Sequence, residues 1–68
     1  MEIPASAIVN IQEVLEGRRH AAIQLSPDVG DPPVGAIITG ADGQRYEVYE
    51  LRSRAMGNTG AIVQANIL

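Results

Sequence analysis

The chain has 68 residues with five arginines, no lysine and eight acidic side chains, which gives a formal net charge of −3 and a pI near 4.8. A chain of this length allows one small domain, residues 1–68, which buries only about 60% of the surface that its unfolded form exposes. The acidic balance and the presence of only two aromatic residues argue against nucleic-acid binding, which relies on basic faces and on stacked rings.

The composition excludes most of the ways in which so small a domain is usually stabilised. There is no cysteine, so disulfides and thiolate metal sites are excluded, and the single histidine, His20, would need carboxylates to complete a zinc site. We therefore expect no metal and no cofactor, and we expect homo-oligomerisation to supply the missing stability. No apolar run is long enough to cross a bilayer or to act as a signal peptide, so we expect a soluble protein without a membrane partner.

The first 16 residues predict an arm followed by a regular element. Residues 1–6 contain Pro4, and we expect an N-terminal arm whose Ile3 packs on a neighbour. Residues 7–16, AIVNIQEVLE, fit either a helix with one apolar stripe or a strand, and their β-branched residues favour the strand. As a strand, the segment would carry Val9, Ile11 and Leu15 on one face and Ile8 and Val14 on the other.

The next segments predict a second strand and a long loop. Residues 18–26 alternate cleanly, with Ala21, Ile23 and Leu25 on one face. Glu16-Gly17 before this segment resembles Asp42-Gly43 further on, so the same turn is predicted twice. Residues 26–35 hold three prolines, and we expect an exposed loop with no regular structure, because proline cannot donate to a strand ladder.

Residues 34–51, VGAIITGADGQRYEVYEL, predict a central hairpin around which the remaining strands are arranged. Asp42-Gly43 supplies the turn. The strands are apolar on both faces, which indicates either a strand packed on two sides or one that changes face at a bulge. Residues 61–68 predict the last strand after a turn at residues 57–60. Its inward residues would be Ala61, Val63, Ala65 and Ile67. We therefore expect an all-β domain, an antiparallel meander closed into a small five-stranded barrel of the SH3-like or OB-like kind.

No set of residues predicts catalysis, so we expect a protein that is not an enzyme. His20 has no nucleophile or second base beside it and is best interpreted as a structural or solvated side chain. The aspartates at 28, 31 and 42 lack the ligand spacing of a helical calcium loop, and turn chemistry explains them better. The glycines form no phosphate-binding string.

The arginines are the strongest candidates for an interface. Arginine without lysine favours forked contacts to carboxylates, which suits subunit contacts better than diffuse attraction. The predicted interface residues are Arg45, Arg52, Arg54, Tyr46, Tyr49, Pro32 and Pro33.

Four segments together, residues 23–28 (IQLSPD), 33–38 (PVGAII), 42–48 (DGQRYEV) and 60–65 (GAIVQA), resemble small assembly proteins of tailed bacteriophages, in particular the head-tail joining or head-completion group. The resemblance implies a β-barrel subunit that forms a ring of copies and contacts portal or tail components. It implies a location in the virion, or in the host cytoplasm during assembly. It assigns no catalytic residue.

Two alternatives stay open on the same residues. A decoration, tail or baseplate component would be an equally fair relative. Outside a virion, a small SH3-like or OB-like adaptor that binds a protein or a nucleic acid in a cell would carry the same strand pattern.

Overall fold

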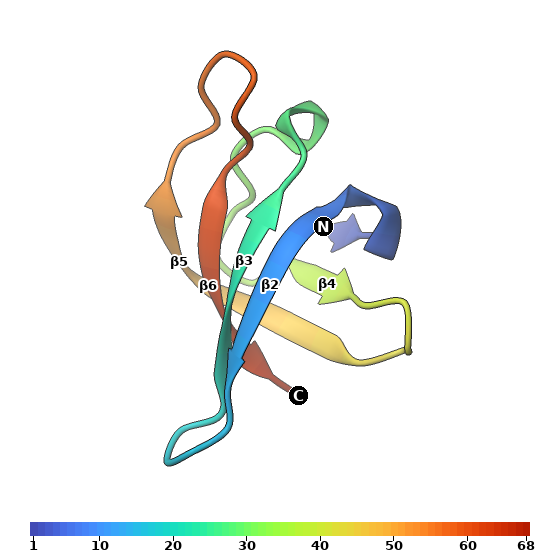
Figure 1. Cartoon of the computed structure of the whole chain (residues 1–68), viewed down its shortest axis with the longest axis vertical. Helices are drawn as coiled ribbons and strands as arrows, with labels where there is room; N and C mark the ends of the chain where they lie inside the picture. Colours follow the sequence, from blue (N-terminus) through green and yellow to red (C-terminus); the bar gives the residue numbers. More distant parts are fainter.

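The computed structural model describes residues 1–68 and shows one six-stranded sheet with two short 3-10 turns (Figure 1). The elements in chain order are β1 (Glu2–Ile3), η1 (Ala5–Ala7), β2 (Ile8–Val14), β3 (His20–Leu25), η2 (Pro27–Val29), β4 (Ile37–Thr39), β5 (Arg45–Ser53) and β6 (Ile62–Ile67). No helix in the structure has the length and apolar character needed to cross a membrane.

The sheet is curled into a half-barrel and its strands lie in the order β1-β4-β5-β6-β3-β2. β1 runs parallel to β4, and every other neighbouring pair is antiparallel. The two edge strands, β1 and β2, follow each other in sequence and are joined by η1, so the N-terminal segment passes from one edge of the curled sheet to the other. The all-β prediction is thus confirmed.

Three details of the predicted barrel are wrong. The expected N-terminal arm contains a sixth strand, because the Ile37 N–H donates to the Met1 carbonyl at 2.8 Å and Glu2 and Ile3 pair with β4. The barrel is not closed, because β1 and β2 are both edges and do not pair. The strands do not form a simple meander, because β3 pairs with β6 rather than with β4.

The two predicted turns are confirmed. Gly17 and Gly43 both adopt positive φ angles, 63° and 88°, which residues with a Cβ rarely adopt. In the second turn the Gln44 N–H donates to Asp42 Oδ1 at 3.0 Å, so the aspartate stabilises the turn through its own side chain. Local chemistry therefore explains both the β2–β3 and the β4–β5 hairpins.

β2 confirms the strand interpretation of residues 7–16 but corrects the assignment of its faces. A register shift between Ile8 and Asn10 places a bulge at the start of the strand. Because the bulge adds one residue, Ile8 and Ile11 both turn toward the core, whereas Val9 is 60% exposed. A second shift between Val48 and Glu50 confirms the bulge predicted for β5.

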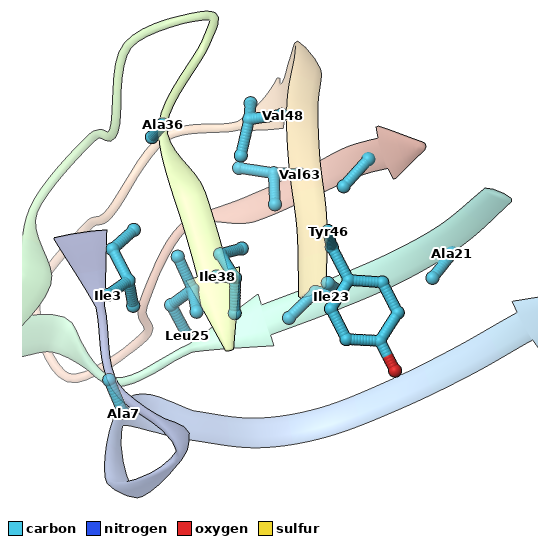
Figure 2. Close-up of a cluster of buried hydrophobic side chains, with 11 residues drawn as sticks. Ile3, Ala7, Ala21, Ile23, Leu25, Ala36, Ile38, Tyr46, Val48 and Val63 are labelled. Atoms are coloured by element: carbon cyan, nitrogen blue, oxygen red, sulfur yellow. The ribbon is translucent and has the colours of Figure 1, made fainter. Parts of the chain in front are cut away.

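The core is a cluster of eleven buried residues, most of them Ile, Val, Leu or Ala, on the concave side of the sheet (Figure 2). Ile3 of β1 is 2% exposed and belongs to this cluster, so it packs within its own chain. Tyr46 is the one aromatic member. Figure 2 shows its ring at one end of the cluster, with the hydroxyl oxygen beside β2.

The β2–β3 hairpin is joined to the rest of the sheet mainly through the pairing of β3 with β6. The Leu25 N–H donates to the Ala61 carbonyl at 2.9 Å, and β3 continues alongside β6. At Gly60 the backbones approach so closely that an added Cβ would lie 1.6 Å from the Leu25 carbonyl oxygen. Glycine is therefore required at position 60 by space rather than by a turn conformation.

The Pro-rich loop, residues 26–35, is more ordered than its composition predicts. Pro27–Val29 form the 3-10 turn η2, because proline suits the first position of a helical turn, where no N–H is needed. Pro32 is buried. The prediction of a wholly irregular, exposed loop is thus wrong for these residues.

Candidate functional site

The most distinctive feature of the molecule is an open strand edge. β2 is seven residues long and is paired with β3 on one side only. Its other side presents unpaired backbone N–H and C=O groups, which form a ready template for another strand. We call residues Ile8–Val14 the open edge. At the opposite end of the sheet, β1 has only two residues and offers little template.

A second potential edge, on β5, is covered. β5 has nine residues and β4 only three, so β5 extends well beyond the end of β4. The loop of residues 31–35 is bonded to both ends of this extension: the Gly35 N–H donates to the Val48 carbonyl at 2.8 Å, and the Ala55 N–H donates to Asp31 Oδ1 at 2.7 Å. We call residues 49–53 the covered edge. The two prolines of the loop, at positions 32 and 33, have no N–H to offer a further strand.

A groove of about 540 Å³ lies beside the open edge. One wall is β2, through Ile8, Ile11 and Glu13, and the facing wall is the β4–β5 turn at residues 40–42. Tyr46 also lines the groove, as does Ala5 of η1. The groove is therefore the gap in the half-barrel, where a closed barrel would place another strand.

One side-chain hydrogen bond spans this gap. The Tyr46 hydroxyl donates to Glu13 Oε2 at 2.7 Å and so links β5 to β2 across the half-barrel. Burial of the ring, followed by the hydrogen bond to Glu13 and the negative charges of Glu13 and Asp42, raises the pKa of the Tyr46 phenol to about 12. The phenol therefore stays protonated and remains a hydrogen-bond donor throughout the neutral range.

The charge of the groove is entirely acidic. Among its lining residues, Glu13 and Asp42 carry carboxylates and none is an arginine. Each carboxylate accepts one hydrogen bond from within the chain, Glu13 from Tyr46 and Asp42 from the Gln44 N–H. The remaining lining is mainly apolar, so the groove combines an apolar floor with two negative charges.

Comparison with protein-family models, curated proteins and solved structures found no match.

The residues predicted for an interface are not gathered at one place. Arg45 begins β5, whereas Arg52 lies near its other end and Arg54 directly follows it. All three arginines and Pro33 are exposed, whereas Tyr46 and Pro32 are buried within the chain. Of the seven, Tyr46 alone lines the groove.

Tyr49 lies on the outer side of the sheet under an arginine. The Arg18 guanidinium is 4.5 Å from the centre of the Tyr49 ring, and Arg18 Nε donates to Asn66 Oδ1 at 3.0 Å. The β2–β3 turn is thereby attached to β5 and β6. Tyr49 is half-buried by this contact.

Three of the other titratable residues considered in the sequence analysis, His20, Asp31 and Asp42, have hydrogen-bond partners. His20 Nδ1 lies 2.8 Å from the Arg18 carbonyl, and Asp31 and Asp42 each accept a backbone N–H. No group of three or more His, Asp or Glu side chains gathers where it could hold a metal ion. Ile8 and Glu13 were not predicted as site residues. The bulge that places Ile8 on the same face as Ile11 has no signature in the local sequence. Glu13 follows Ile11 on that face by ordinary alternation, but its neighbour across the sheet, Tyr46, is 33 residues away in the sequence.

Proposed function

We propose that this protein is a non-enzymatic assembly protein that joins neighbouring proteins through an incomplete β-barrel. The observation that carries the proposal is the open edge of seven residues beside an apolar groove. Exposed edges of this kind are usually blocked in proteins that act alone, because they template unwanted pairing. Here one edge is covered by a loop while the other is left free, which suits a subunit that pairs with a partner.

The biological setting we propose is a tailed bacteriophage particle. The resemblance of residues 23–28, 33–38, 42–48 and 60–65 to head-tail joining proteins supports a ring-forming connector, head-completion or tail component. In such a ring the copies contact one another, and portal or tail proteins contact the ring. Arg52 and Arg54 are exposed at the end of β5 and are the charged groups we assign to contacts between copies.

Sedimentation of the purified protein, with negative-stain electron microscopy of the same sample, tests this proposal. We expect a closed ring of copies, and we expect Arg52→Ala with Arg54→Ala to shift the sedimenting species toward smaller oligomers while the circular dichroism spectrum stays unchanged. Arg19→Ala removes one arginine from an exposed position outside the predicted interface and is the control for the single substitutions Arg52→Ala and Arg54→Ala. A chain that stays monomeric at all concentrations contradicts the ring.

A second candidate function is a small adaptor of the SH3-like or OB-like kind that binds a protein segment as a monomer. The observation that favours it is the core: eleven residues are buried within a single chain, without any contribution from a neighbour. A monomeric protein that binds a protein segment would support the adaptor over the ring. A salt-dependent shift of an oligonucleotide would instead support its nucleic-acid form.

A further inference from the structure

We propose that the groove receives an extended segment of a partner protein, which pairs with β2 as a seventh strand and brings a basic side chain to Glu13 and Asp42. This inference rests on the proposed assembly function and deepens it by naming the chemistry of the partner. It is argued from the open edge, from the residues that line the groove and from their charge.

The backbone of the partner segment is set by the open edge. An extended chain placed beside β2 would form main-chain hydrogen bonds with the side of the strand that β3 leaves unpaired. Side chains alternate along a strand, so every second residue of the added segment would turn toward the concave side of the sheet. These residues would cover Ile8 and Ile11, which are only partly buried in the chain alone.

The floor of the groove sets the apolar part of the partner. Ile8, Ile11 and Ala41 line it, and Tyr46 closes its base. The cavity of about 540 Å³ is open to solvent along the gap between β2 and the β4–β5 turn. Apolar side chains on the inward face of an added strand would fill this space and extend the core of the half-barrel.

The two carboxylates set the charged part of the partner. Covering Glu13 and Asp42 with an apolar or acidic segment would remove them from water without a counter-charge, which is costly. An arginine or lysine on the inward face of the segment would supply that charge. The forked guanidinium of arginine suits a carboxylate that already accepts one hydrogen bond, as Glu13 does from Tyr46.

The same charge argument disfavours a second copy of β2 as the occupant. β2 has the sequence IVNIQEV, so its single charged residue is Glu13 and it carries no cation. Pairing of two β2 strands would bring a third carboxylate to a groove that already holds two. β5 has arginines, but it is held inside the sheet between β4 and β6.

The test uses a seven-residue peptide, the length of β2, with the sequence Arg-Thr-Val-Thr-Val-Thr-Arg and blocked ends. Its arginines and valines share one face, so the peptide presents the proposed pattern in either direction along β2. Binding to the full chain is followed by ¹H–¹⁵N spectra. We expect saturable shifts concentrated on the amides of Ile8–Val14. A peptide with glutamate in place of both arginines should bind at least about tenfold more weakly.

Protein variants test whether the two negative charges of the groove contribute to peptide binding. Glu13→Gln with Asp42→Asn removes both charges but keeps the oxygens that accept hydrogen bonds from Tyr46 and Gln44, and it should weaken binding of the arginine peptide about tenfold. Glu47→Gln with Glu50→Gln changes the net charge equally at exposed positions of β5 that do not line the groove. We expect binding to that control variant to stay within about twofold of the original.

Backbone pairing is tested with N-methylated peptides. An extended chain presents alternate N–H groups to its two sides, so methylation of the three threonine nitrogens and methylation of the two valine nitrogens block opposite edges. Each of these two peptides can then pair in one direction only, whereas a peptide methylated at all five nitrogens can pair in neither direction and should lose binding. Retention of binding by the peptide methylated at all five nitrogens would overturn the strand pairing.

Other outcomes also decide the question. Equal binding of the arginine and glutamate peptides, shifts located away from β2, or pairing of two copies through β2 that the peptide does not displace would each overturn the proposal. Rings without peptide binding would overturn the partner strand and leave the assembly role intact. Peptide binding by a chain that never assembles would support the strand and overturn the assembly role.

Discussion

The two long strand edges of this small sheet differ in whether a loop covers them. The covered edge, residues 49–53 of β5, lies between two hydrogen bonds made by the Pro-rich loop, at Val48 and at Ala55. The open edge, Ile8–Val14 of β2, has no such cover and lies beside a groove. The difference teaches that loop composition alone does not identify a binding site. Here the loop blocks one edge, and the site lies where no loop is present.

The largest expected effect comes from Gly60, which brings β6 against Leu25 at the start of the loop that forms the cover. Gly60→Ala would place a Cβ 1.6 Å from the Leu25 carbonyl oxygen, so the backbones must separate. We expect a loss of about 4 kcal/mol or more, which is close to the whole stability of a domain this small. Urea unfolding monitored by circular dichroism measures it.

Gly57→Ala is the matched control, because Gly57 has a positive φ of 59° but no atom within 4 Å of an added Cβ. Its cost should be only about 1–2 kcal/mol, from backbone strain. Equal costs at the two positions would show that β6 can move away from Leu25 without disturbing the covered side.

The next effect concerns the bond that spans the open side. Tyr46→Phe removes the hydroxyl that donates to Glu13 and should cost about 1–2 kcal/mol of the free energy of unfolding. Because folding raises the pKa of the phenol from 10.0 to about 12, its contribution is complete below pH 10 and is lost as the pH rises from about 10 to 12.

Urea unfolding measured at intervals from pH 8 to pH 12 therefore distinguishes Tyr46→Phe from the original chain. The original chain should lose stability steeply above pH 10, and Tyr46→Phe should lose less over the same interval. Tyr49→Phe, on the outer side of the sheet, should keep the steep decline. If Tyr46→Phe declines as steeply as the original chain, folding does not raise the pKa of the Tyr46 phenol.

A smaller effect on the free energy of unfolding is expected for the loop that covers β5. Asp31→Ala removes the acceptor for the Ala55 N–H and should cost about 1 kcal/mol. It should also speed hydrogen exchange at residues 49–55, because the loop is then attached to the strand only near Val48. Asp31→Asn keeps a side-chain oxygen and should exchange like the original chain. Unchanged exchange in Asp31→Ala would mean that the loop covers the edge without this bond.

The smallest effect on stability is expected for lysine on the open edge. Val9 is 60% exposed, so Val9→Lys should change the free energy of unfolding by less than about 0.5 kcal/mol. A charge there discourages strand pairing, so self-association or partner binding should still fall. Val34→Lys, at a position 71% exposed in the loop that forms the cover, should alter neither. If Val9→Lys and Val34→Lys self-associate and bind a partner equally, the open edge is no more important for pairing than the loop.

The hairpins and most inward-facing residues could be predicted from the sequence because their causes are local. Gly17 and Gly43 fix the turns, and strict alternation places Ala21, Ile23 and Val63 in the core. The same local chemistry explains the Asp42 side-chain bond within its turn. Such features depend on residues a few positions apart in the sequence, and sequence patterns describe residues at that spacing.

The sheet order and the groove depend on contacts far apart in the sequence. Nothing near Glu2 and Ile3 indicates that they pair with Ile37 and Ile38, and the same holds for the pairing of β3 with β6. The bulge after Ile8 places Ile8 and Ile11 on the same inner face, and Glu13 lies on that face opposite Tyr46. The candidate site therefore emerges only when the curled sheet brings β2 near the β4–β5 turn.

The central position of β6 has a consequence for biosynthesis. β6 is the last strand to be translated, yet it lies between β5 and β3 and joins the two halves of the sheet. Until it leaves the ribosome, a nascent chain holds two separate hairpins whose inner faces and edges are exposed. The fold can therefore form only after translation has passed β6, and chaperones that shield apolar strands would act on this protein during that interval.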